Sequence, residues 1–340
     1  MSLFAPQFQI LSDLHLETPL SRPQYTTFNI NAHANNFFLL GDIGLVKDNG
    51  LFIFLKQCLE QNPGARIFYI LGNHEPYQTT LNLAVEKLRV FEEEAKLEYG
   101  GRFKFLFRNR YDLNQDITIL GCTLWSAIQP HQATEVHTRL TDFNKARGIQ
   151  NWTLEDYSEE HRKDLEWLNA QVLSIQENEP NRQIVIATHH CPTTDPRATD
   201  PAHQDSTVGS AFVSELSNEI CWTSPAVKLW AFGHTHYSCN FRDEETGKLV
   251  VSNQKGYMGL GGHAKRSVRV RVVEADDQAW RVIDFDGKAA QPKETEPIEA
   301  SMTQDSNNQT SSQHEEDSRR KQQPKLSLFQ RTKLVFRPKR

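Results

Sequence analysis

The sequence predicts an α/β fold. Short, nearly uninterrupted apolar runs alternate along the chain with longer segments of helical period. Continuous apolar runs are typical of strands that are covered on both faces, and strands that alternate with helices are typical of α/β proteins. The apolar runs are QILS (residues 9–12), NNFFLL (35–40), RIFYIL (66–71), RQIVIAT (182–188) and VKLWAF (227–232).

Two longer segments have the period and the ends of amphipathic helices. In residues 79–101 the apolar side chains share one stripe, and Gly100 and Gly101 are expected to end the helix. The second segment covers residues 151–175, where Thr153 is the predicted N-cap and Asp156 follows three residues later. The side chains expected to be buried are Leu81, Val85, Leu88 and Phe91 in the first helix and Leu165, Leu168, Val172 and Ile175 in the second.

Two further regions alternate apolar and polar residues with period two. They are ITILGCTLW (residues 117–125) and SVRVRVVEADDQAWRVIDF (267–285), and the second contains a predicted hairpin turn at Asp276 and Asp277. This pattern is typical of antiparallel strands with one solvated face. We therefore expect a second sheet or a sheet of mixed direction.

Composition divides the chain into two parts. Residues 1–288 contain the apolar periods and are predicted to form one domain, whereas residues 289–340 are predicted to be a disordered tail, acidic and polar at first and then basic. The basic part of the tail, residues 319–340, is a candidate nuclear-localisation signal or nucleic-acid contact. Its stretch LSLFQRTKLVF is a candidate partner-docking or membrane-surface segment. A solvated appendage is the simpler interpretation.

Charge limits the partners of the main domain. The chain has a net charge of −5, but residues 319–340 contain nine Lys or Arg and no acid, which leaves 29 basic and 43 acidic residues elsewhere, a net charge of −14. An acidic surface lacks the positive footprint that long duplex DNA requires. A small anionic substrate is still expected to bind if a metal supplies the positive charge.

The sequence also predicts where the protein resides. No apolar run approaches the roughly 20 residues that span a bilayer, and the N-terminus has no charged region followed by a cleavable apolar segment. We therefore expect a cytoplasmic protein, with a nuclear location as the alternative suggested by the basic tail. The five cysteines form no CxxC pair and are expected to be reduced core thiols.

A metal-competent residue follows each continuous apolar run. In open α/β sheets ligands bind at the carboxyl ends of the strands, and alternate residues of an extended chain point the same way. Asp13 and His15 can therefore coordinate one ion together, and so can His234 and His236. The predicted ligands are Asp13, His15, Asp42, Asn73, His189, His234 and His236.

This donor set is larger than one ion requires. Three oxygen ligands and four imidazoles exceed the needs of a single ion with an open position, so two ions that share a bridge fit better. Mixed oxygen and imidazole donors without thiolate favour Mn, Fe or Zn. A mononuclear Fe(II) oxygenase is the alternative enzyme class, but two histidines and one carboxylate would leave Asp42, Asn73 and two histidines unused.

The order DxH, GD, GNH(E), a later His, and GHxH resembles the calcineurin-like metallophosphoesterase superfamily from Asp13 to His236. The resemblance implies a four-layer αββα sandwich, in which two mixed β-sheets pack face to face and helices flank them, with a dinuclear metal centre at the sheet edge. It implies that Asp13, His15 and His236 hold the first metal, that Asn73, His189 and His234 hold the second, that Asp42 bridges both, and that His74 faces the substrate.

Two blocks depart from a simple match. The stretch THHCP offers two histidines where the family uses one, and His189 is assigned as the ligand because it directly follows the strand, with His190 as a pocket residue. The second block reads GDIGLV and lacks the second Asp and the Arg of GDxxDRG. Arg would hold a phosphoryl group with two hydrogen bonds, so Ser/Thr protein phosphatase activity is disfavoured.

These observations give a hypothesis for the reaction. The two ions would bind a bridging water, lower its pKa and direct the resulting hydroxide at the phosphorus of a small or medium phosphomonoester or phosphodiester. His74 would bind the phosphoryl group or protonate the leaving oxygen, oriented by Asp13 or Glu75. The further pocket candidates are Glu75, Tyr77, His161 and His190. A metal-bearing scaffold without turnover is the non-enzymatic alternative.

Overall fold

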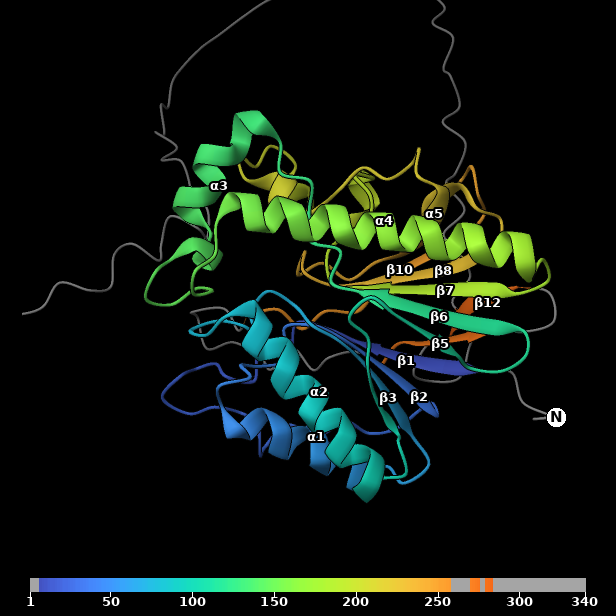
Figure 1. The fold of residues 1–340 in the computed structure, drawn as a ribbon, viewed down its shortest axis with the longest axis horizontal. Coiled ribbons are helices and arrows are strands. Elements are labelled where there is room, and N and C mark those ends of the chain that lie inside the picture. The colour runs from blue at the N-terminus through green and yellow to red at the C-terminus, as the bar shows by residue number, and fades with distance from the viewer. Residues whose placement is uncertain (1–5, 258–269, 276–278, 284–340) are drawn as a thin grey trace, which may run out of the picture. The chain divides into compact units, whose positions relative to one another are not determined.

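The computed structural model describes residues 6–257, 270–275 and 279–283. These residues form two six-stranded mixed sheets that pack face to face, with helices on both outer faces (Figure 1). The predicted four-layer αββα sandwich is therefore confirmed. All of the described residues belong to one compact unit, Met1–Lys293. The proposed domain boundary at residues 288 and 289 and the tail lie outside the described residues and stay predictions.

The first sheet has the strand order β12-β11-β1-β2-β3-β4. Strands β1 to β4 run parallel, β11 pairs antiparallel with β1, and β12 pairs antiparallel with β11. The strands are β1 (Gln7–Leu11), β2 (Asn36–Leu40), β3 (Arg66–Ile70), β4 (Phe103–Phe105), β11 (Val272–Ala275) and β12 (Trp280–Ile283). The predicted hairpin pairing is confirmed in β11 and β12.

The second sheet has the strand order β5-β6-β7-β8-β10-β9. Its strands are β5 (Asn109–Asp112), β6 (Ile117–Cys122), β7 (Gln183–Thr188), β8 (Val227–Phe232), β9 (Asn240–Arg242) and β10 (Leu249–Ser252). The expectation that β6 has a solvated face is wrong. Strand β6 pairs parallel with β7 as well as antiparallel with β5, and all six of its residues are buried because helices cover the outer face of the sheet.

The helices lie on the outer faces of the two sheets. Helices α1 (Asn49–Gln61) and α2 (Leu81–Glu98) cover the first sheet, and α4 (Leu154–Asn178) and α5 (Ile220–Thr223) cover the second (Figure 1). A short helix, α3 (Ala133–Arg139), lies in the segment between β6 and α4. Helix α4 begins at the predicted Thr153 N-cap, and the capping box with Asp156 is complete.

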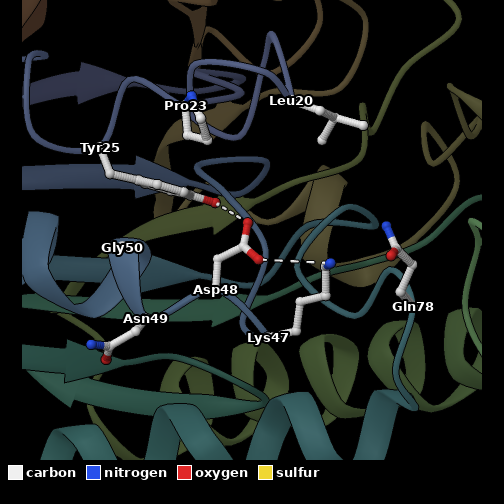
Figure 2. A pocket seen from close by; sticks show the side chains of 8 residues that line it. All are labelled: Leu20, Pro23, Tyr25, Lys47, Asp48, Asn49, Gly50 and Gln78. Atoms are coloured by element: carbon white, nitrogen blue, oxygen red, sulfur yellow. Dashed lines mark hydrogen bonds and ion pairs between the residues drawn. The ribbon is translucent and has the colours of Figure 1, made fainter.

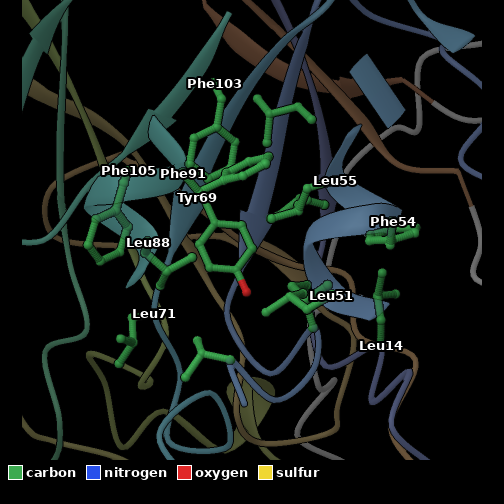
Figure 3. Packing of buried hydrophobic residues seen from close by; sticks show 14 of the residues in the cluster. Leu14, Leu51, Phe54, Leu55, Tyr69, Leu71, Leu88, Phe91, Phe103 and Phe105 are labelled. Atoms are coloured by element: carbon green, nitrogen blue, oxygen red, sulfur yellow. The ribbon is translucent and has the colours of Figure 1, made fainter. Parts of the chain in front are cut away.

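Alternate residues of each strand fill different cores. Phe8, Phe38 and Phe68 of the first sheet pack between the sheets against Val185 and Leu229 of the second, whereas their neighbours along the strands face the helices. Figure 3 shows this outer core, where the ring of Tyr69 lies among the apolar side chains of β4, α1 and α2. Since both faces of the strands are covered, the central strands are rigid supports for the loops at their carboxyl ends.

Two smaller expectations can also be compared with the structure. All five cysteines are buried and free, as expected for core thiols. Within the described ranges, no helix has the length and apolar content needed to cross a bilayer.

Candidate metal centre

The predicted ligands meet at the carboxyl ends of strands from both sheets. Asp13, Asp42 and Asn73 follow β1, β2 and β3, while His189 and His234 follow β7 and β8. The backbone turns sharply there, and five of the seven residues have left-handed φ angles: Asp13 (54°), His15 (47°), Asp42 (54°), His234 (69°) and His236 (52°). Non-glycine residues rarely adopt this conformation, and where they do so together the position usually serves a function.

The first group of donors contains Asp13, His15, Asp42 and His236, whose ligand atoms all lie within 4.8 Å of one another. Nε2 of His15 lies 3.0 Å from Nε2 of His236. Nε2 of His236 lies 3.3 Å from Oδ1 of Asp13, and Nε2 of His15 lies 3.8 Å from Oδ2 of Asp42. Four donors thus converge on one point, as the coordination of a single cation requires.

The second group lies on the other side of Asp42. Nε2 of His189 is 3.1 Å from Oδ1 of Asn73 and 3.4 Å from Oδ1 of Asp42, and the rings of His189 and His234 are 4.9 Å apart. Asp42 therefore presents Oδ2 to the first group and Oδ1 to the second. This is the arrangement expected of a bridging carboxylate, although its role as a bridge stays a prediction.

The two histidines of THHCP have different surroundings. Nδ1 of His189 donates to the carbonyl of Leu40 at 2.7 Å, which leaves its Nε2 lone pair directed at Asn73 and Asp42. Nδ1 of His190 bonds to Ser126 Oγ at 2.8 Å, and its ring packs on His234 with centroids 3.9 Å apart. His190 also falls in a close donor group with His189 and His234. The contacts favour His189 as the ligand and His190 as its alternative.

The protonation states fit a divalent cation. Burial and the nearby charge of His74 lower the pKa of His15 to about 3, and burial lowers the pKa of His189 to about 4. Both imidazoles are therefore neutral and carry a free lone pair, as metal ligands must. Burial, together with the charges of Glu75 and Asp13, raises the pKa of Asp42 well above its usual range. A cation beside Asp42 would offset that cost.

Gly41 makes room for this packing. It has a φ of +85°, and a Cβ added there would lie 2.5 Å from Nδ1 of His189. A side chain would therefore displace His189 from its bond with Leu40 and strain the backbone. The absence of a side chain at Gly41 therefore permits the close approach between the end of β2 and His189.

Glu75 supports the loops at the sheet edge and does not contact His74. Its two carboxylate oxygens accept the backbone N–H groups of Asp42, Ile43 and Gly72 and the hydroxyl of Tyr69, at 2.8 to 3.0 Å. Because those acceptor positions are occupied, the expectation that Glu75 orients His74 is wrong. Asp13 does not orient it either, since its carboxylate receives the backbone N–H of His234 and faces His236.

Sequence reasoning missed Asp142, a buried carboxylate from the segment between α3 and α4. It accepts the side-chain amide of Asn73 at 2.9 Å and the hydroxyl of Tyr77. With the NH₂ group of Asn73 held there, its Oδ1 atom is directed at His189. Tyr77, predicted as a pocket residue, also packs its ring on His74 with centroids 4.2 Å apart. No local pattern marks Asp142, because it reaches the site only through the fold.

Glu17 and Tyr257 are the other residues that complete the site. Glu17 lies two positions after His15, and its Oε1 atom accepts hydrogen bonds from Nδ1 of His15 and Nδ1 of His74. Tyr257 packs on the ring of His15 at 4.3 Å, and its hydroxyl lies 2.8 Å from Nε2 of His74. The DxHxE spacing was a signal that could have indicated Glu17.

The remaining candidate, His161, lies outside the close donor groups found among the described residues. It belongs to α4, and its Nδ1 donates to the carbonyl of Leu124 at 2.8 Å. This bond anchors the loop after β6, which leads to Ser126 and thus to His190. His161 thus supports the loop beside the site, and its role as a pocket residue stays a prediction.

A groove of about 610 Å³ lies over the loops that follow β1, β2 and β3. Figure 2 shows Asp48 between Tyr25 and Lys47, with Leu20 and Gln78 on the side away from Tyr25. Each loop begins at the site: Leu20 follows Glu17, Lys47 follows Asp42, and Gln78 follows His74. None of the seven predicted ligands lines the groove; the lining residues are Leu20, Pro23, Tyr25, Lys47, Asp48, Asn49, Gly50 and Gln78.

The chain belongs to the calcineurin-like phosphoesterase family. The sequence model of that family matches residues 7–238, which contain both sheets' central strands and all seven predicted ligands. Membership of this family and the His and Asp donor groups support metal-dependent hydrolysis of phosphoester bonds.

A viral protein and an enzyme of known structure are among the proteins similar to the chain. It is 26% identical over 266 residues to uncharacterized protein L509 of Acanthamoeba polyphaga mimivirus, an alignment that covers 73% of this chain and 90% of the viral protein. The crystal structure of phosphopantetheinyl hydrolase (PptH) from Mycobacterium tuberculosis superposes with a TM-score of 0.53 at 14% identity. That match covers 74% of this chain and 90% of the other, and it indicates a shared fold.

Proposed function

We propose that the protein is a dinuclear metallophosphoesterase that hydrolyses small or medium phosphomonoesters or phosphodiesters. The observation that carries the proposal is the position of Asp42, whose two oxygens face separate groups of donors. Asp13, His15 and His236 would hold one ion, and Asn73, His189 and His234 the other. Mn, Fe and Zn are the divalent ions that suit these oxygen and imidazole ligands.

The ions would supply a water of lowered pKa as the nucleophile and neutralise charge on the phosphoryl oxygens. The chain itself would provide the proton for the leaving group. Although burial opposes it, the negative charges of Asp42 and Glu17 raise the pKa of His74 to about 9. A protonated His74 can donate from Nε2 to the leaving oxygen, since its Nδ1 proton is bound by Glu17.

The groove over the loops that follow β1, β2 and β3 is a candidate location for the organic part of the substrate. Its three loops begin at Glu17, Asp42 and His74, and it combines the apolar surfaces of Leu20 and Pro23 with the ammonium group of Lys47. The activity named for the fold neighbour, phosphopantetheinyl hydrolase, is compatible with a small or medium phosphoester as the substrate of this protein. A protein phosphatase is disfavoured because GDIGLV provides no Arg for the phosphoryl group.

A panel of aryl phosphate monoesters and diesters, assayed with added manganese, tests the proposal directly. We expect hydrolysis together with close to two transition-metal ions per chain in the purified protein. One ion per chain would favour the mononuclear alternative. Two ions without turnover of any ester would favour a metal-bearing scaffold and contradict the proposed reaction. A preparation that can bind no transition metal would contradict the whole proposal.

A further inference from the structure

Glu17 is a buried carboxylate that lies between two imidazole rings. Its exposed fraction is 3%. Its Oε1 atom accepts a hydrogen bond from Nδ1 of His15 at 3.3 Å and another from Nδ1 of His74 at 3.1 Å. A carboxylate oxygen has two lone pairs and can accept both protons. A predicted metal ligand and the predicted proton donor are therefore bound to the same atom.

These two bonds determine which nitrogen each ring presents to the site. When Nδ1 carries the proton that Glu17 accepts, Nε2 is the atom that faces away from Glu17. Nε2 of His15 and Nε2 of His74 both lie 3.8 Å from Oδ2 of Asp42. Glu17 thus directs the Nε2 atoms of both rings toward the same carboxylate, at the centre of the site.

The neighbouring acids do not perform this task. Glu75 is occupied by backbone N–H groups and Tyr69, and Asp13 by His234 and His236. Among the described residues, the second oxygen of Glu17 has no hydrogen-bond partner. The carboxylate is therefore held at this position mainly by its contacts with the two histidines.

We propose that Glu17 is the positioning residue of the site, which holds His74 for proton donation and His15 for metal binding through one shared oxygen. The proposal rests on the proposed function and deepens it, because it identifies the group that orients the proton donor. Glu17 itself touches neither the substrate nor the reacting atoms.

The first test compares Glu17→Gln with Glu17→Asp. In Glu17→Gln we expect kcat to fall by about 10- to 100-fold, the range typical of lost carboxylate partners of active-site histidines, with KM nearly unchanged. The loss should be larger for an alkyl phosphate than for 4-nitrophenyl phosphate, because a poor leaving group needs the proton more. Glu17→Asp should restore part of kcat. The control is Glu60→Gln, an exposed carboxylate on α1 that bonds Tyr99.

A double-variant cycle separates positioning from general damage. If Glu17 acts through His74, Glu17→Gln should cause no further loss of kcat in a His74→Ala background. Losses that multiply in the double variant would overturn the proposal. So would equal losses for the alkyl and the aryl ester in Glu17→Gln.

A third measurement does not depend on turnover. In ¹H–¹⁵N spectra of the imidazole groups, the Nδ1 proton of His74, assigned by its absence in His74→Ala, should shift in Glu17→Gln and in Glu17→Asp. An unchanged signal in both variants would overturn the proposal even if the wild-type protein is an active enzyme. A shifted signal in a protein that hydrolyses no phosphoester would instead refute the proposed function and leave the contact intact.

Metal analysis completes the experiment, because His15, Glu17 and His74 also form a close donor group. We expect Glu17→Gln to retain two ions per chain, or to bind the first ion more weakly. Three ions in the wild type, with one lost in Glu17→Gln, would show that Glu17 is itself a ligand and would overturn the positioning role. Melting curves of both variants establish that each one is folded.

Discussion

Asn73 depends on a residue 69 positions away in the chain. Its amide NH₂ donates to Asp142 and to the hydroxyl of Tyr77, and only this orientation turns Oδ1 toward His189. An amide without that restraint can rotate and present its NH₂ group, which cannot bind a cation. The segment before α4 therefore takes part in the geometry of the proposed second metal position.

Replacement of Asp142 should consequently affect one ion more than the other. We expect Asp142→Ala to weaken binding of the second ion by about 10- to 100-fold and to leave the first ion bound. Metal titration followed by elemental analysis measures both. Asp116→Ala, a change at an exposed carboxylate, is the control. Unchanged affinity for two ions in Asp142→Ala would show that Asn73 needs no such partner.

His74 should be separable from metal binding. We expect His74→Ala to keep two ions and to lose about 10²- to 10⁴-fold in kcat, the usual contribution of a general acid. Steady-state kinetics and metal content, measured on the same preparation, test this, with the exposed His131→Ala as control. Hydrolysis near the wild-type rate would exclude His74 as the proton donor.

Single residues also show what sequence reasoning can and cannot detect. Asp13 and Asp42 were predictable because the carboxyl ends of neighbouring parallel strands meet at one edge of a sheet, so local position implies proximity. The same rule brings His189 and His234 together at the edge of the second sheet. Asp142 was not predictable, since its approach to Asn73 depends on the path of a long connection with no regular period. Glu75 was assigned the wrong role because sequence gives proximity to His74 but not the backbone N–H groups that occupy its oxygens.

At the scale of elements, a partly buried group of three charged residues joins the segment before β5, helix α4 and the loop after β6. Arg108, just before β5, pairs with Asp164 and Glu160 of α4, and Asp164 also accepts the backbone N–H of Leu124 after β6. These contacts thus hold α4 over the loop that leads to Ser126. Although Arg108 opposes the effect, burial raises the pKa of Asp164 to about 7.

Removal of Arg108 should therefore destabilise the fold in a pH-dependent way. We expect Arg108→Met to lower the free energy of unfolding by about 3 kcal/mol at pH 8, as for other buried charges that lose their partner. The cost should be smaller at pH 5, because the folded variant can keep Asp164 protonated there. In the unfolded state Asp164 has its ordinary pKa near 4 and is ionised at both pH values.

Denaturant unfolding at both pH values measures this difference. Arg110→Met is the matched control, since Arg110 forms more exposed pairs with Asp112 and Glu179 and should cost about 1 kcal/mol or less. An equal cost for Arg108→Met at pH 5 and pH 8 would contradict the account.

The elements differ in how well sequence predicted them. Helix α4 was predictable because Thr153, Asp156 and an apolar stripe agree. The sequence pattern of β6 was misleading: Thr118 lies at a position expected to be solvated, yet it is buried and bonds Asp112 and Arg182. A polar residue that finds partners within the fold can occupy a covered face, and periodicity alone cannot reveal those partners.

At the scale of the whole molecule, we expect the two sheets and the site to form without residues 289–340. Strand β12 ends at Ile283, and every described site residue lies before it. We expect deletion of residues 289–340 to leave the melting temperature and kcat/KM on aryl phosphates unchanged, because no predicted ligand or core strand is removed. Loss of activity on these small substrates would refute the proposed domain boundary.

The left-handed backbone at five of the seven predicted ligands has a cost of its own. Each such conformation is unfavourable by on the order of 1 kcal/mol. The orientation of these side chains toward the site therefore lowers the free energy of unfolding. Glycine at any of those positions would relieve the backbone strain but would also remove a metal-ligand side chain. Selection for thermal stability alone would therefore favour substitutions that remove these ligands. A screen for more stable variants of this protein must also select for activity.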